Sequence, residues 1–192
     1  MDFLLQLDGN ILLAIQEYIR HDWMDSFWKF ITSLGDSGWF WLTVSFLLLI
    51  PRKTRKAGIT AIVAIAIGAL ITNVTLKNLV ARTRPYEVVQ GLTLLIERQH
   101  DFSFPSGHTC ASFAAALVYY RLLPRFWGIA SIILAALIAF SRLYVGVHYP
   151  SDVLVGLLVG AFGAWASIRI VEYIGSKWGR GALSKRLSLI HI

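Results

Sequence analysis

Long uncharged stretches dominate the hydrophobic pattern of this chain. The clearest runs over residues 57–76 without a charged side chain, and an α-helix needs about 20 apolar residues to cross a bilayer. Similar stretches follow further along. The pattern predicts an all-α fold, a polytopic membrane helical bundle, whose approximately five transmembrane helices lie near residues 35–50, 57–79, 104–123, 126–146 and 151–174.

The segment before these spans mixes apolar and polar positions and predicts helices of another kind. In residues 3–19 apolar side chains recur at helical spacing, at Leu4, Leu7, Ile11, Ile15 and Tyr18. This is typical of an amphipathic helix that lies at the membrane interface. A second interfacial helix is predicted around residues 24–34, with three aromatic anchors, Trp23, Trp28 and Phe30.

Composition and charge placement agree with a membrane protein. Only 15% of the residues are charged, against about 25% in soluble domains. The net charge of +7 comes largely from residues 51–56, 121–125 and the region after 174, which five spans would place on one side. That side is predicted to be cytoplasmic. The basic excess is therefore a topology signal, and no basic patch with interleaved aromatic residues predicts nucleic-acid binding.

The length predicts one domain, residues 1–186. The apolar end of the chain, residues 187–192, follows a basic segment and is interpreted as a non-native tail. The N-terminus carries acidic residues and no basic region, so it does not resemble a cleaved signal peptide. A single cysteine, Cys110, excludes an intrachain disulfide.

Polar residues gather near the outer ends of the predicted spans. Lys77 and Arg84 are seven residues apart, which is two turns and one face if the helix continues as far as Pro85. The other groups open the third span and close the fourth: Ser106, Gly107, His108, Arg142, His148 and Asp152. All of them would therefore lie at one depth.

Each of these residues alone has a bland interpretation, such as a snorkelling lysine or a serine that caps a helix. Together they are harder to dismiss, because burying a cation at membrane depth costs about 2.5–3.5 kcal/mol. Three cations beside one carboxylate, Asp152, leave uncompensated positive charge. Two arginines, a lysine and the backbone N–H groups of Ser106, Gly107 and His108 suit an anion with several oxygens, and phosphate fits.

The two histidines have different neighbours. His148 precedes Asp152 by four residues, so the carboxylate could fix the ring tautomer and leave the other nitrogen as a nucleophile. His108 has no carboxylate near it in sequence and could donate a proton to a leaving oxygen.

Three blocks, "KNLVARTRP", "PSGH" and "SRLYVGVHYPSD", resemble the signature of the type-2 phosphatidic acid phosphatase and vanadium haloperoxidase superfamily, within residues 77–152. The resemblance extends over about residues 57–170 and implies a membrane lipid phosphatase. It implies that Lys77, Arg84, Ser106, Gly107 and Arg142 bind phosphate. It also implies that His148 forms a phosphohistidine, Asp152 orients it and His108 protonates the leaving group.

The resemblance implies a reaction without a metal or any other cofactor. The expected partners are membrane lipids and a lipid phosphate substrate, for which undecaprenyl pyrophosphate, phosphatidylglycerol phosphate and phosphatidic acid are the candidates. The site would face the extracytoplasmic side of a bacterial inner membrane. A lipid phosphotransferase, a vanadate-dependent haloperoxidase and a non-catalytic lipid binder are alternatives, of which the last two are disfavoured by the spans and by the intact histidines.

The outer loop between the second and third spans carries further polar side chains. They are Arg82, Tyr86, Glu97, Arg98, His100 and Asp101. These could contact a lipid headgroup, but a solvated loop surface is the favoured interpretation.

Overall fold

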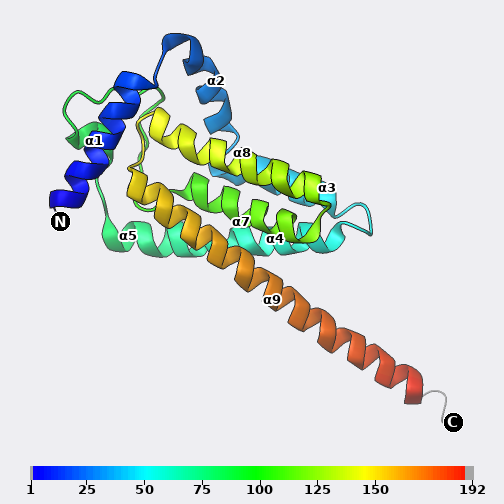
Figure 1. The fold of residues 1–192 in the computed structure, drawn as a ribbon. Coiled ribbons are helices and arrows are strands. Elements are labelled where there is room, and N and C mark those ends of the chain that lie inside the picture. The colour runs from blue at the N-terminus through cyan, green and yellow to red at the C-terminus, as the bar shows by residue number, and fades with distance from the viewer. Residues whose placement is uncertain (1, 189–192) are drawn as a thin grey trace.

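The computed structural model describes residues 2–188, and every regular element among them is a helix, which confirms the all-α prediction (Figure 1). Residues 189–192 of the predicted tail lie outside the described part. The elements are α1 (Asp2–Tyr18), α2 (Asp22–Ser33), the 3₁₀ helix η1 (Asp36–Gly38), α3 (Trp39–Leu48), α4 (Arg55–Ala69), the π-helical segment η2 (Leu70–Leu76), α5 (Lys77–Val80), α6 (Pro85–Val88), α7 (Gly107–Leu122), α8 (Arg125–Tyr144) and α9 (Pro150–Ser188).

Helix α7 forms the centre of the bundle and packs against α4, α8 and α9 (Figure 1). Its small side chains at residues 114–116 are completely buried, which lets the neighbouring helices approach. A Cβ atom on Gly156 of α9 would lie 2.6 Å from the carbonyl oxygen of Ser106, and one on Gly160 would lie 2.6 Å from that of Cys110. Small residues at this spacing therefore permit the close contact of α9 with α7.

Among the described residues, three helical segments are long and apolar enough to cross a membrane: Arg55–Val88, Arg125–Tyr144 and Pro150–Lys177. Helix α3 has ten residues, a length of about 15 Å, and α7 has sixteen. The predicted count of five spans is therefore not confirmed. The second predicted span is interrupted by η2, and such π-helical segments occur frequently at functional sites.

The N-terminal region forms the two predicted helices, α1 and α2. Trp23 and Phe30 are exposed, as anchors would be, but Trp28 is only 7% exposed. The prediction of Trp28 as an interfacial anchor is wrong, because α2 lies against α8 and stacks this ring on Tyr144 with centroids 5.3 Å apart. The interfacial position of the two helices stays a prediction.

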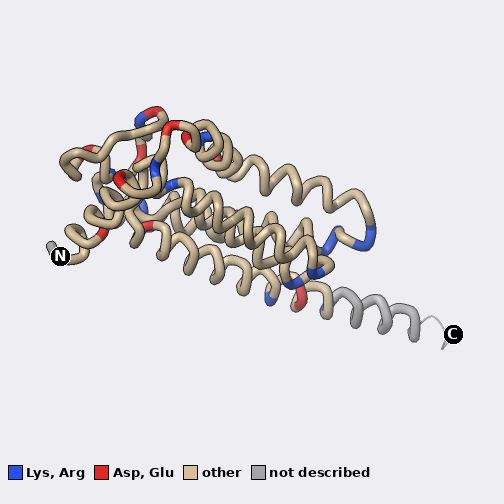
Figure 2. Tube along the Cα trace, turned by 45° about the horizontal axis from the view of Figure 1, so that its top comes forward, with Lys and Arg blue, Asp and Glu red and all other residues tan. Residues whose placement is uncertain are grey.

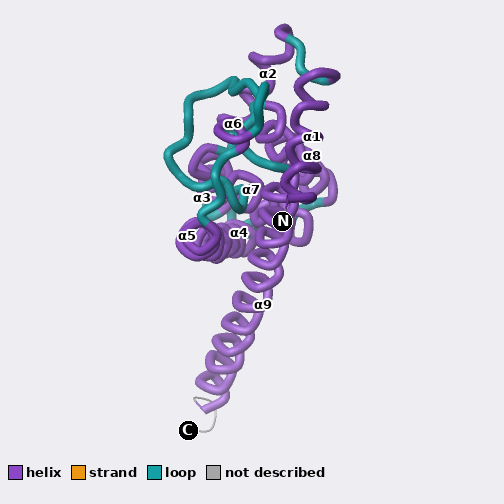
Figure 3. Tube along the Cα trace, turned by 90° about the vertical axis from the view of Figure 1, so that its left-hand side faces the viewer, coloured by secondary structure: helices purple, strands orange, loops and turns teal. Residues whose placement is uncertain are grey.

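The two ends of the bundle differ in chemistry. The basic segments at residues 52–56 and 121–125 lie at the end where α3 meets α4 and α7 meets α8 (Figure 2). At the opposite end, α6 and the long loops cover the start of α7 (Figure 3). The signature residues gather at this loop-covered end.

Candidate active site

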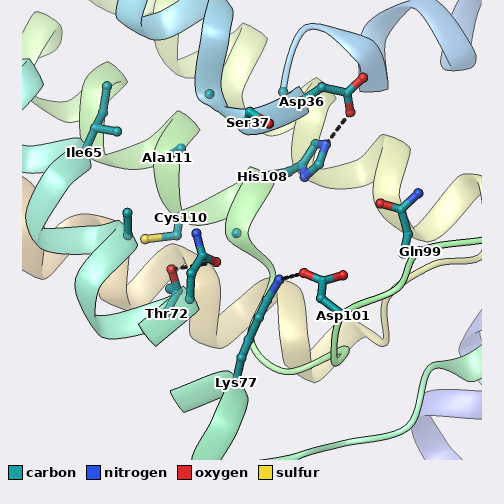
Figure 4. Close-up of a pocket in the computed structure, with 15 residues that line it drawn as sticks. Asp36, Ser37, Ile65, Thr72, Lys77, Gln99, Asp101, His108, Cys110 and Ala111 are labelled. Carbon is teal, nitrogen blue, oxygen red and sulfur yellow. Dashed lines mark hydrogen bonds and ion pairs between the residues drawn. The ribbon is translucent and has the colours of Figure 1, made fainter. Parts of the chain in front are cut away.

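A cavity of about 570 Å³ opens at the loop-covered end between η1, η2, α5 and the start of α7. Its polar lining includes Asp36, Asn73, Lys77, Gln99, Asp101 and His108 (Figure 4). Arg84, Arg142 and His148 do not line the cavity, and each is at most 4% exposed. The signature residues therefore form two layers, one at the cavity wall and one buried.

Lys77 and Arg84 meet, but not on one helical face as the sequence suggested. Helix α5 ends at Val80 because Ala81 adopts a left-handed conformation with φ of 48°, so Arg84 approaches from extended backbone. Both cations hold the same carboxylate, that of Asp101. Lys77 Nζ contacts one oxygen, and Arg84 Nη2 donates to the other at 2.5 Å.

Asp101 changes the charge balance predicted for the site. We expected Asp152 to be the one carboxylate near the cations, but Asp101 ion-pairs with two of them. Burial works in the opposite direction, yet the ammonium of Lys77 and the guanidinium of Arg84 lower the pKa of Asp101 to about 2. The negatively charged carboxylate of Asp101 therefore occupies two of the predicted phosphate ligands, Lys77 and Arg84.

Arg142, in the last turn of α8, is 1% exposed. Its Nη1 donates to Thr32 Oγ1 at 2.7 Å, whereas its buried Nε has no hydrogen-bond partner among the described residues. The guanidinium interacts electrostatically with Arg84 and with both histidines. A buried guanidinium with an unused donor beside another cation is a strong indication of an anion-binding site.

His148 and Asp152 form the predicted pair at the start of α9. His148 Nδ1 lies 3.5 Å from Asp152 Oδ2 and 3.5 Å from Ser103 Oγ. The opposite nitrogen, Nε2, has no hydrogen-bond partner among the described residues and is available for nucleophilic attack. Burial lowers the pKa of His148 to about 3, and the positive charges of Arg142 and Arg84 act in the same direction. The ring is therefore neutral near pH 7, as a nucleophile must be.

Asp152 is held by more groups than the sequence predicted. Its Oδ2 accepts from Ser103 Oγ at 2.5 Å and from the Tyr149 N–H at 2.9 Å. Its Oδ1 accepts from Arg82 Nη1 at 2.6 Å. A carboxylate with this many donors stays ionised and fixed in orientation.

Arg82 corrects the favoured interpretation of the outer loop as a solvated surface. Its side chain is 16% exposed and stacks over the Tyr149 ring, 3.8 Å from the centroid. Besides Asp152 it contacts Asp8 of α1, with Nη2 2.8 Å from Oδ2. Asp8 also accepts from the Ser151 N–H at 3.1 Å. Helix α1 is thereby tied to the pair of His148 and Asp152.

Ser106 is a predicted phosphate ligand, but its backbone N–H and its hydroxyl oxygen have partners within the protein. Its backbone N–H donates to the Asp152 carbonyl at 3.1 Å, and its hydroxyl caps α7 by accepting from the Thr109 N–H at 3.4 Å. Gly107 lies at the cavity wall, where a Cβ atom would approach Asn73 Oδ1 to 3.1 Å. The helix start therefore offers an anion the N–H groups of Gly107 and His108.

His108 has a carboxylate partner that the sequence did not reveal. Its Nε2 lies 2.9 Å from Oδ1 of Asp36, which is 72 residues away in η1 (Figure 4). In the sequence Asp36 was only a charge that limited the first span. Similarly, no local signal marked Asp8 or Ser103, because their partners are distant in the chain. The described residues contain no group of three or more His, Cys, Asp and Glu side chains suited to a metal ion.

Comparison with known proteins gives relatives that include several lipid phosphatases. An undecaprenyl-diphosphatase from Sulfolobus acidocaldarius is 38% identical over 130 residues, which are 68% of this chain and 63% of that protein, less than two thirds of its length. The crystal structure of LpxE from Aquifex aeolicus has a TM-score of 0.72 at 30% identity, covering 87% of this chain and 93% of that one.

A third relative is a transmembrane phosphatidylglycerolphosphate phosphatase of the PAP2 type from Bacillus subtilis. Its structure has a TM-score of 0.73 at 27% identity and covers 91% of this chain and 89% of that one. The family model of the PAP2 superfamily matches residues 57–176, which include all eight predicted site residues. The chain therefore belongs to the PAP2 superfamily.

Proposed function

We propose that the protein is an integral-membrane phosphatase that removes phosphate from lipid headgroups through a phosphohistidine on His148, without a metal. The observation that carries this proposal is the buried guanidinium of Arg142, whose Nε has no partner in the described chain. It interacts with Arg84 and with the neutral ring of His148. Bound phosphate would use the free donor and bring phosphorus to the nucleophile.

Binding would begin at the cavity. Lys77 lines the wall, and Arg84 lies beneath it. Because both cations hold the Asp101 carboxylate, the phosphate would take the place of this carboxylate. The Asp101 side chain is 53% exposed and can turn towards water. Arg142 and the N–H groups of Gly107 and His108 would complete the cradle.

The chemistry would proceed in two steps. His148 Nε2 attacks phosphorus, an N–P bond forms, the P–O bond to the lipid breaks and His108 gives a proton to the leaving oxygen. A water molecule then loses a proton to His108 and attacks phosphorus, the N–P bond breaks and inorganic phosphate leaves. Asp152 stabilises the positive charge that the His148 ring carries in between.

The names of the relatives support lipid phosphates as substrates. Relatives include an undecaprenyl-diphosphatase, lipid A phosphatases and a phosphatidylglycerolphosphate phosphatase. We therefore propose undecaprenyl pyrophosphate, phosphatidylglycerol phosphate or phosphatidic acid as the substrate. We also propose that residues 1–186 form one domain in a bacterial inner membrane, with the site on the side opposite the basic loops.

The test is phosphate release by the detergent-purified protein from these three lipids and from a soluble phosphate ester, each with and without EDTA. Release should be unaffected by EDTA and abolished in His148→Ala. His100→Ala is the matched control, since this exposed loop histidine should be dispensable. Full activity in His148→Ala would contradict the mechanism, and loss of activity in EDTA would contradict its independence of metal.

A further inference from the structure

Asp36 is an ionisable residue at the cavity that belongs to none of the three signature blocks. It lies in η1, and its Oδ1 is 2.9 Å from His108 Nε2 (Figure 4). The residue is outside the matched region of the family model, which begins at residue 57. The signature blocks therefore do not explain why Asp36 contacts His108.

The turn around Asp36 has a conformation that permits this contact. A Cβ atom on Gly35 would lie 2.5 Å from His108 Cδ2 and 2.9 Å from Ile138 Cγ2, so a larger residue would displace the imidazole ring. Ser37 has φ of 51° and Gly38 has φ of 68°. A left-handed conformation at a residue other than glycine costs roughly 1–3 kcal/mol and occurs most at functional sites. The backbone is therefore held in an unfavourable conformation where Asp36 meets His108.

The charges that act on His108 show what Asp36 could do. Burial disfavours the protonated form of the ring, and the positive charges of Arg142 in α8 and Lys77 in α5 act in the same direction. Asp36 is the negative group that acts on His108 and favours its protonated form. Burial and two cations thus discourage the acidic form of the proposed acid, and Asp36 is the neighbour that supports it.

We propose that Asp36 is a positioning residue that orients His108 and raises its affinity for the proton that it transfers to the leaving oxygen. The proposal rests on the proposed phosphatase function. The pair is accessible to water, because the side chains of His108 and Asp36 are 15% and 60% exposed. Water can therefore restore the proton after each turnover.

This role predicts that Asp36 matters according to the leaving group. An alkoxide released from a lipid alcohol is strongly basic and needs a proton in the transition state. A nitrophenolate is stable as an anion and needs little help. The parameter kcat/KM isolates this step, because it includes only the events up to the first irreversible bond cleavage and omits hydrolysis of the phosphohistidine.

The experiment compares the wild type with Asp36→Asn on phosphatidic acid and on 4-nitrophenyl phosphate. General acid catalysis contributes roughly 100- to 10,000-fold. We expect Asp36→Asn to lower kcat/KM about 10- to 100-fold on phosphatidic acid and less than about 3-fold on the aryl ester. The alkaline limb of the profile for phosphatidic acid should shift to lower pH, since His108 then loses its proton more easily. Asp36→Glu should recover part of the loss.

Asp22→Asn is the matched control, because it removes a negative charge from an exposed position at the start of the preceding helix. It should leave both activities unchanged. Equal losses on both substrates in Asp36→Asn, with no shift of the pH profile, would show a structural role and overturn the proposal. A wild-type protein that hydrolyses neither substrate would contradict the proposed function instead.

Discussion

The two histidines of the site have carboxylate partners in contrasting surroundings. His148 and Asp152 are almost completely buried, with side chains 2% and 0% exposed, and Ser103 and Arg82 hold the carboxylate. His108 is 15% exposed, and its partner Asp36 is 60% exposed. The difference fits the two proposed roles. A nucleophile needs a fixed, neutral ring, whereas an acid must regain its proton from water in every cycle.

The strongest way to break the buried pair is Asp152→Asn. The amide leaves the volume unchanged but removes the charge that stabilises the His148 ring when it becomes positive. Comparable changes in catalytic triads cost up to about 10,000-fold in kcat, and we expect a loss of roughly 100- to 10,000-fold, measured as phosphate release. A loss smaller than that of Asp36→Asn on phosphatidic acid would contradict the assigned order of importance.

The protonation of His148 sharpens the comparison further. With a pKa of about 3 the ring should stay neutral down to about pH 5, where an ordinary histidine with a pKa of about 6.5 is mostly protonated. Ring ¹⁵N chemical shifts in detergent or nanodiscs, assigned with His148→Ala, measure this directly. A ring that becomes protonated between about pH 7 and 5 would contradict the assignment.

The lowered pKa of His148 also affects the stability of the folded protein. The folded protein binds fewer protons at His148 than the unfolded chain, so its contribution to the free energy of unfolding decreases as the pH falls from about 6.5 towards 3.

Asp8→Asn tests the connection between α1 and the buried pair. The substitution weakens the contact of Asp8 with Arg82, which in turn holds Asp152. We expect kcat to fall by about tenfold or less while KM changes little, since Asp8 does not line the cavity. Glu17→Gln, at an exposed position of the same helix, should have no effect. An equal loss in both variants would show that helix charge, and not this contact, is responsible.

The smallest expected effect belongs to Asp101→Asn. The variant removes the carboxylate that lies on Lys77 and Arg84, so an anion no longer competes with it. Inorganic phosphate should then inhibit the enzyme a few-fold more tightly. A few-fold change corresponds to less than about 1.4 kcal/mol, the free energy of a tenfold change. Weaker inhibition would show that Asp101 organises the two cations for binding and does not compete for them.

The signature residues could be found from the sequence because their identities and short spacings mark them. His148 and Asp152 lie on either side of the first residue of α9, and Ser106, Gly107 and His108 lie together at the start of α7. Long apolar stretches likewise revealed the core helices. These features depend on neighbours along the chain, which a single sequence displays.

The partners of these residues depended on the folded path of the loops. The sequence predicted that Arg82 and Asp101 belong to a solvated surface. The segment between α5 and α7 instead covers the end of the bundle (Figure 3) and brings Arg82 to Asp152 and Asp101 to two cations. Asp36 and Asp8 reach the site from elements 72 and 74 residues away from their partners. Trp28 was misplaced for a similar reason, because its burial comes from the packing of α2 on α8. Hydrophobic periodicity carries no information on such long-range contacts.

The most direct test of the central claim is to capture the intermediate in His108→Ala. With 4-nitrophenyl phosphate the first step needs little acid, but the water that hydrolyses the phosphohistidine has lost its base. We expect a burst of nitrophenolate that matches the enzyme concentration, and mass spectrometry should find the phosphoryl group on His148. The double variant His108→Ala with His148→Ala should give neither the burst nor a phosphorylated enzyme. Phosphate on another residue, or nitrophenolate release without any phosphorylated enzyme, would contradict the account.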